Sequence, residues 1–119
     1  MLALPSSSVS SPHDPDTVVV VHSSAPDAEV ARRIARALVD RRAAACVQVI
    51  PGLHSTYRWE GRLEEAEEVL LLIKTTRGRL AELELALREL HPYEVPECVA
   101  VEAAHVAAPY RAWVLDETA

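Results

Sequence analysis

The chain has 119 residues, of which 50% are hydrophobic and 25% are charged, and its only aromatic residues are three Tyr and two Trp. This length fits one domain, and the aliphatic content excludes a wholly disordered chain. The longest aliphatic runs are far shorter than the roughly 18 residues of a membrane-spanning helix. A net charge of −6 without a basic stripe argues against a nucleic acid partner.

Residues 1–16 contain five serines, three prolines and little that a core could bury. We therefore expect a disordered tail here and a single domain over residues 17–119. The chain has no positively charged start followed by an apolar run, and its two cysteines form no CxxC pair. These features predict a cytoplasmic protein with reduced thiols.

Hydrophobic periodicity and turn residues divide the domain into short elements. In chain order we expect a strand at 17–22, a helix to about 42 and a long hairpin. The first strand of this hairpin, at 44–50, is broken at Pro51-Gly52 and continues as an extended segment at 55–59, and its returning strand is at 67–75. A helix at about 79–90, a fourth strand at 97–101 and a helix at 109–115 follow. Ser24 is expected to cap the first helix, with Asp27 completing a capping box. Tyr110, Trp113 and Val114 are expected to form the buried side of the last helix.

This order is the βαββαβ pattern of ferredoxin-like α+β folds, with an added C-terminal helix. Right-handed crossovers place the four antiparallel strands in the order 4-1-3-2, so the helices cover one face of the sheet only. An antiparallel sheet with one wet face should alternate apolar and polar residues. These strands are instead apolar on both faces, which predicts a homo-oligomer packed sheet to sheet.

The predicted topology brings the end of the first strand, the end of the second helix and the start of the fourth strand to one rim of the sheet. His22, Ser23 and Ser24 are expected at this rim together with His91, Tyr93 and Glu97. Two imidazoles beside hydroxyl and carboxylate groups suit a borderline cation such as copper or zinc. The alternative is structural, with His91 capping its helix and His22 on the surface.

Cys46 opens the second strand, and Lys74 closes the third. In a hairpin that turns at Glu60-Gly61, residues whose numbers sum to about 121 should face each other, apart from slippage at Pro51-Gly52. This register brings the Cys46 thiol close to the Lys74 amine. A neighbouring lysine favours the thiolate, and hence metal binding or nucleophilic chemistry. The alternative is a small buried cysteine that acts as a hydrophobic residue.

Tyr57, Arg58 and Trp59 gather two aromatics and a cation near the hairpin tip. They suit a stacking platform for a ligand or the anchor of a subunit contact. The acidic run at residues 64–68 is typical of a solvated face. The sequence contains no glycine-rich phosphate loop, GxSxG or HExxH motif, so it predicts no standard hydrolase.

Five segments share their order and spacing with one known family. They are Ala45-Cys46-Val47, Ile50-Pro51-Gly52, the YRWEG segment at 57–61, the LLIKTT segment at 71–76 and the HPYEVPE segment at 91–97. Together they resemble the CutA family of divalent-cation tolerance proteins. The similarity runs from about residue 18 to the end of the chain.

The resemblance implies a cytoplasmic homotrimer of ferredoxin-like subunits, architecturally similar to the PII signalling proteins and linked to tolerance of divalent metals, copper above all. By this resemblance His91 matches a metal-associated histidine, and Cys46 matches the strand cysteine of the family. Ser23 and Leu90 stand where some members have Cys and His. The resemblance implies neither an enzyme activity nor an organic cofactor.

Three functions stay open at this point. The first is a trimer that binds copper or another divalent cation through His91, helped by His22 or Cys46. The second is a PII-like trimer that binds a small molecule between subunits. Its candidate ligand or interface residues are Lys74, Tyr57, Arg58, Trp59, Tyr93 and Glu97. The third is an enzyme that uses Cys46 or His91.

Overall fold

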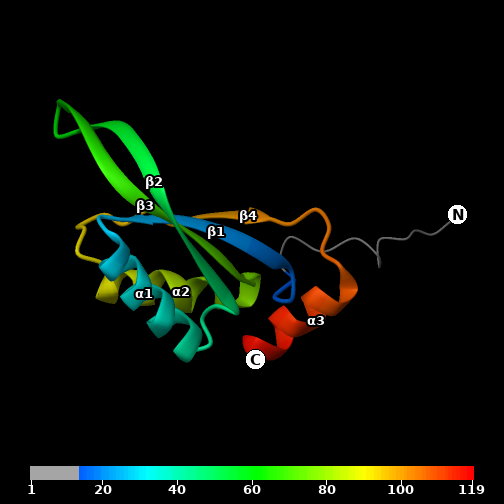
Figure 1. Cartoon of the computed structure of the whole chain (residues 1–119). Helices are drawn as coiled ribbons and strands as arrows, with labels where there is room; N and C mark the ends of the chain where they lie inside the picture. The colour runs from blue at the N-terminus through cyan, green and yellow to red at the C-terminus, as the bar shows by residue number, and fades with distance from the viewer. Residues whose placement is uncertain (1–13) are drawn as a thin grey trace, which may run out of the picture.

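Four antiparallel strands and three α-helices make up residues 14–119, the part of the chain that this computed structural model describes (Figure 1). In chain order they are β1 (Val18–Ala25), α1 (Ala28–Asp40), β2 (Cys46–Trp59), β3 (Arg62–Thr76), α2 (Leu80–Leu90), β4 (Val99–Glu102) and α3 (Ala108–Glu117), with a 3-10 turn (Arg77–Arg79) before α2. The sheet order β2-β3-β1-β4 confirms the predicted ferredoxin-like topology.

Most of the predicted tail, residues 1–13, lies outside the described residues. Residues 14–16 form a turn in which the Pro15 carbonyl accepts a hydrogen bond from the Gly78 N–H at 3.0 Å. A Cβ added at Gly78 would lie only 3.0 Å from the Cβ of Pro15, so this close approach favours glycine. Pro15 therefore packs closely against the turn that precedes α2.

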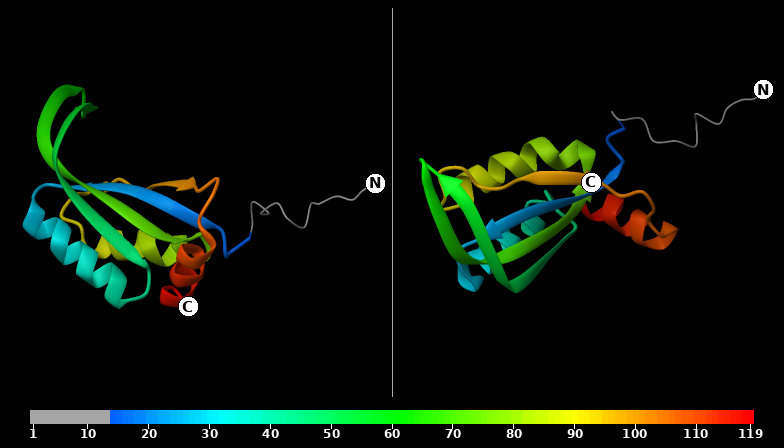
Figure 2. Two further views of the ribbon diagram at one scale, coloured as in Figure 1. Left: turned by 45° about the vertical axis from the view of Figure 1, so that its right-hand side comes forward. Right: turned by 90° about the horizontal axis from the view of Figure 1, so that it is seen from above.

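Helices α1 and α2 lie side by side on one face of the sheet, which is called the inner face below (Figures 1 and 2). Alternate residues of each strand point toward this face, because side chains alternate along a strand. Val21, Leu71 and Ile73 are fully buried there, in one cluster with Ile34 and Leu87 of the helices. Burial of each such side chain contributes roughly 1.5–3 kcal/mol, so this layer is the main core.

The first helix has a different cap from the one predicted. Asp27, not Ser24, is the N-cap, and its carboxylate accepts a hydrogen bond from the Val30 N–H at 2.8 Å. Ser24 lies in β1, where it pairs with Leu70 of β3. The predicted capping box was wrong because strand pairing holds the backbone at Ser24 in the sheet. The helix also ends before residue 42, since Arg42 has a left-handed φ of 58°.

The long β2–β3 hairpin curls away from the rest of the sheet (Figures 1 and 2). Its strands turn at Glu60 and Gly61 as predicted, and both residues have positive φ, of 50° and 80°. The predicted sum of 121 holds in the outer hairpin, for example at the pair Trp59↔Arg62. The sequence predicted an interruption between residues 50 and 55 of the first strand. In the structure β2 instead pairs with β3 along nearly the whole hairpin.

A β-bulge at Pro51-Gly52 changes the register of this hairpin. Two residues of β2 lie there opposite one residue of β3, and Gly52 has a φ of 91°. The shift of one position turns Tyr57 and Trp59 to the same face as Glu68, because side chains alternate strictly on both sides of the bulge. The slippage was predicted from Pro51-Gly52, but this consequence was not.

The face of the sheet opposite α1 and α2, called the outer face below, is apolar and uncovered. Val99, Val101 and Ile50 point to it and are 54%, 53% and 42% exposed. Leu70 and Leu72 of β3 lie on the same face and are half-buried. Within residues 14–119 no helix lies over the middle of this face (Figure 1), so the apolar second face that the sequence predicted is present.

Helix α3 packs across the end of the sheet where β1 begins. Val114 is fully buried against Val18 and Ala45, whereas Tyr110 and Trp113 are each 41% exposed and lie 5.4 Å apart between ring centroids. The prediction that all three α3 side chains are buried was wrong for the two aromatics. A helix at the end of a sheet contacts only a narrow strip, which Val114 fills.

Candidate functional site

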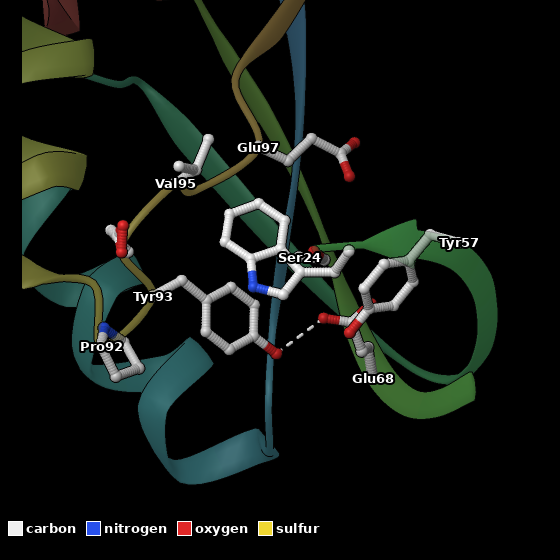
Figure 3. A pocket seen from close by; sticks show the side chains of 9 residues that line it. Ser24, Tyr57, Glu68, Pro92, Tyr93, Val95 and Glu97 are labelled. Atoms are coloured by element: carbon white, nitrogen blue, oxygen red, sulfur yellow. Dashed lines mark hydrogen bonds between the residues drawn. The ribbon is translucent and has the colours of Figure 1, made fainter. Parts of the chain in front are cut away.

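A pocket of about 470 Å³ opens where the outer face meets the rim at the end of β1 (Figure 3). Ser24 comes from β1, and Glu68, Tyr57 and Trp59 come from the curled hairpin. The segment between α2 and β4 closes the other side, with lining residues Pro92, Tyr93, Glu94, Val95 and Glu97. Four of the predicted ligand or interface residues therefore share this rim pocket, namely Tyr57, Trp59, Tyr93 and Glu97.

Tyr93 and Glu68 link the two sides of the rim pocket. The Tyr93 hydroxyl donates a hydrogen bond to Glu68 Oε2 at 2.7 Å, and Figure 3 shows this bond spanning the pocket beside Tyr57. Glu68 is only 9% exposed, so the interpretation of residues 64–68 as a fully solvated face was wrong for this residue. The curl of the hairpin buries Glu68, and local sequence gives no signal for that curl.

His91 holds the segment that carries Tyr93. It ends α2, is buried, and its Nε2–H donates to the Ser24 carbonyl at 2.6 Å, while its Nδ1 accepts from the Tyr93 N–H at 3.1 Å. The His91 and Tyr93 rings lie 4.5 Å apart between centroids. The predicted juxtaposition at the rim is therefore present, and here His91 positions the loop.

The three predicted metal donors lie at separate places in one subunit. His22 is on the outer face of β1, Cys46 begins β2 at the far end of that face, and both ring nitrogens of His91 are hydrogen-bonded. Over residues 14–119 no group of three or more His, Cys, Asp or Glu is placed to hold a metal ion. One subunit therefore does not supply a complete metal site from these residues.

Ser23 lies at the same rim but on the inner face of the sheet. Its side chain is fully buried, and its hydroxyl has no hydrogen-bond partner among the described residues. It pairs with Leu71 of the core. Ser23 therefore points away from the rim pocket.

Cys46 pairs with Lys74 across the strands, as the register predicted. The Lys74 ammonium donates a hydrogen bond to Gln48 Oε1 at 2.5 Å, so its hydrogen-bond partner is this amide and not the Cys46 thiol. Tyr110 of α3 also approaches Cys46: burial first, and then the neighbouring thiol, raises the pKa of Tyr110. The sequence missed this contact because α3 reaches Cys46 only through the tertiary fold.

Arg58 and Lys74 stand apart from the rim pocket. Arg58 pairs with Leu63, on the opposite face of the hairpin from Tyr57, and Lys74 lies at the other end of β3. Sequence reasoning missed Glu68 and Glu94 as pocket residues. Glu94 could have been found from its place between Tyr93 and Glu97 in the same short segment.

The Tyr93–Glu68 contact predicts a pH dependence of stability. Burial, and next the hydrogen bond to Glu68, raises the pKa of Tyr93 well above its ordinary value of 10.0. Above that pH the folded chain keeps a proton that the unfolded chain loses, so the free energy of unfolding falls as pH rises. Urea unfolding over an alkaline pH series measures this fall, which should be shallower in Tyr93→Phe.

Tyr57→Phe is the comparison for this series, because it removes a hydroxyl from the same pocket but keeps the Tyr93–Glu68 hydrogen bond, and its slope should change less than that of Tyr93→Phe. Equal slopes in Tyr93→Phe and the wild type would contradict the assignment to Tyr93.

This sheet, covered by helices on one face, defines a ferredoxin-like α+β protein with a rim pocket. The crystal structure of CutA from Xylella fastidiosa has the same fold, with a TM-score of 0.84 and 40% identity over 87% of this chain and 99% of that one. The family model for the CutA1 divalent ion tolerance protein matches residues 19–117. The chain therefore belongs to the CutA1 divalent ion tolerance protein family.

Curated relatives agree with this assignment. The divalent-cation tolerance protein CutA of Thermus thermophilus is 48% identical over 99 residues, which cover 83% of this chain and 96% of that protein. Human protein CutA is 40% identical over 96% of this chain, but the match spans only 64% of the human protein. Within residues 14–119, no helix is long and apolar enough to cross a membrane.

Proposed function

We propose that this chain acts as a homotrimer in the response to divalent metal ions, with a role in binding rather than in catalysis. The family assignment supports the link to divalent cations. The observation that carries the trimer is the outer face, where Val99 and Val101 are more than half exposed in the single subunit. An exposed apolar patch of this kind is typical of a surface that another molecule covers.

The same assembly accounts for the aromatic side chains at the margins of the subunit. Tyr57 and Trp59 near the hairpin tip are 45% and 43% exposed, and Tyr110 and Trp113 on α3 are each 41% exposed. Aromatic residues are enriched where subunits meet. Packing of three such sheets face to face, as in the PII signalling proteins, would bury the aliphatic face and bring these aromatic side chains to its margins, where Tyr57 and Trp59 still line the rim pocket.

The cation site is proposed at His91, with His22 or Cys46 as further donors and copper as the first metal to test. Because one subunit does not gather these donors, we propose weak binding that is completed across a subunit contact. His22 and Cys46 support this, since both lie on the outer face that a second subunit would cover. His91 would have to give up one of its two hydrogen bonds to bind.

Copper titration of the wild type and His91→Ala by calorimetry tests this site. Loss of a residue that only supports a ligand already costs about 10–100-fold in metal affinity, so His91→Ala should weaken binding by at least that factor. His105→Ala is the matched control, because His105 is exposed and lies away from the rim. Equal copper affinity in the wild type and His91→Ala would remove His91 from the proposal.

A second candidate function is a PII-like trimer that binds a small molecule. The rim pocket favours it, because about 470 Å³ lies within the ordinary size range of ligand sites, roughly 300–1,000 Å³. A ligand that binds the folded protein raises its melting temperature. An unchanged melting temperature across a panel of metabolites would count against this function.

We further propose that the protein works in the cytoplasm, which its two free thiols, Cys46 and Cys98, support. Cell fractionation with detection of the full chain tests this location. Recovery of the protein in an extracytoplasmic or organelle fraction would overturn it.

A further inference from the structure

The chemistry of the rim pocket is both aromatic and acidic. Three aromatic side chains and three carboxylates line it, and among residues 14–119 no lysine or arginine does. They are Tyr57, Trp59 and Tyr93, together with Glu68, Glu94 and Glu97. This composition sets the sign of charge that the pocket accepts, because three carboxylates in one cavity repel an anionic ligand such as a phosphate.

The carboxylate of Glu68 is held at the base of the pocket. Glu68 as a residue is only 9% exposed, and its Oε2 accepts a hydrogen bond from the Tyr93 hydroxyl at 2.7 Å. This bond fixes the Tyr93 ring across the pocket from Tyr57 (Figure 3). Because burial and Glu68 raise the pKa of Tyr93, its hydroxyl stays a donor at neutral pH and adds no negative charge of its own.

A bare metal ion does not match this arrangement. Within residues 14–119, the three glutamates do not form a group that could hold a metal ion. Aromatic faces add no ligand atom for a metal, but they attract an alkylated cation through their quadrupole. Carboxylates around aromatic rings are therefore complementary to a cation that carries an apolar surface.

We propose that the rim pocket binds an organic ammonium ion, with its charge facing Glu68, Glu94 and Glu97 and its alkyl groups against Tyr57 and Trp59. This inference rests on the second candidate function, the small-molecule trimer, and names the class of its ligand. It is independent of copper binding at His91. The ligand is a quaternary ammonium or a primary amine, which share this chemistry.

Calorimetric titration of the full chain with choline and, separately, with putrescine tests the proposal. It also distinguishes a quaternary ammonium ligand from a primary amine. Dimethylbutanol, the neutral isostere of choline, measures the contribution of shape alone. We expect saturable binding of at least one of the two cations and at least tenfold weaker binding of the alcohol, which corresponds to about 1.4 kcal/mol. Binding of choline alone assigns a quaternary ammonium, and binding of putrescine alone assigns a primary amine.

Two variants locate the site. Glu94→Gln removes one charge at an exposed position that the fold does not depend on, and Tyr57→Leu removes one aromatic face. Each should weaken binding of the cation by several-fold or more. Glu82→Gln is the matched control, since Glu82 is an exposed carboxylate on α2 outside the pocket, and it should bind like the wild type.

Absence of saturable binding for both cations would overturn the proposal. So would equal affinity for choline and dimethylbutanol, or unchanged binding in both Glu94→Gln and Tyr57→Leu. If neither cation binds but another metabolite raises the melting temperature and Tyr57→Leu abolishes that rise, the ligand class is wrong while the small-molecule function stands.

Discussion

Val101→Lys is expected to convert the proposed trimer into monomers that keep the wild-type fold. Val101 lies on the outer face of β4 and is 53% exposed in the single subunit, so a lysine there can keep its ammonium group in water. In the trimer the same position would be covered. Burial of an unpaired charge costs several kcal/mol per subunit, which is enough to lower the association constant by orders of magnitude.

Light scattering gives the particle mass, and circular dichroism checks that the fold is kept. Leu85→Lys is the matched control, because Leu85 is 59% exposed but lies on α2, on the helical side of the sheet. We expect Leu85→Lys to have the mass of a trimer and Val101→Lys that of one chain. A wild-type protein that is already monomeric, or a Val101→Lys variant that stays trimeric, would refute assembly through the outer face.

Leu71→Ala is expected to cause the largest loss of stability within the subunit. Leu71 is fully buried at the centre of β3, between the sheet and both helices. Removal of a buried leucine side chain leaves a cavity and costs about 2–5 kcal/mol of the free energy of unfolding. Urea unfolding at fixed protein concentration measures this change.

Leu63→Ala on the same strand provides the comparison, since Leu63 is 68% exposed on the curled hairpin. Surface substitutions of this kind usually change the free energy of unfolding by less than about 0.5 kcal/mol. A loss below about 1 kcal/mol for Leu71→Ala would mean that the inner layer is not the main core.

Local sequence signals were sufficient for the strand order and for most elements. The Val run of β1, the leucines of α2 and the Glu60-Gly61 turn each form the predicted structure. The errors fall where tertiary contacts override local preference. Ser24 has the chemistry of an N-cap, but pairing with Leu70 keeps it in β1, and Asp27 takes the role instead.

The candidate site was predicted only in part. The rim that joins Ser24 to His91 followed from topology, and the Cys46↔Lys74 pair followed from counting back from the turn. The contact between Glu68 and Tyr93 could not be predicted in this way. It depends on the bulge at Pro51-Gly52 and on the curl of the hairpin, which bring together residues far apart in the chain.

The sequence by itself determined, once its aliphatic residues were placed on the expected strands, that these side chains exceed what one layer of helices can cover. That follows from strict alternation, because a strand that is apolar at every position must present half of its side chains to the other face. Only the tertiary structure decided which residues those are and where the pocket lies. Burial, bulge geometry and the positions of Tyr57, Glu68 and Tyr93 are properties of packing between distant segments, and no local pattern encodes them.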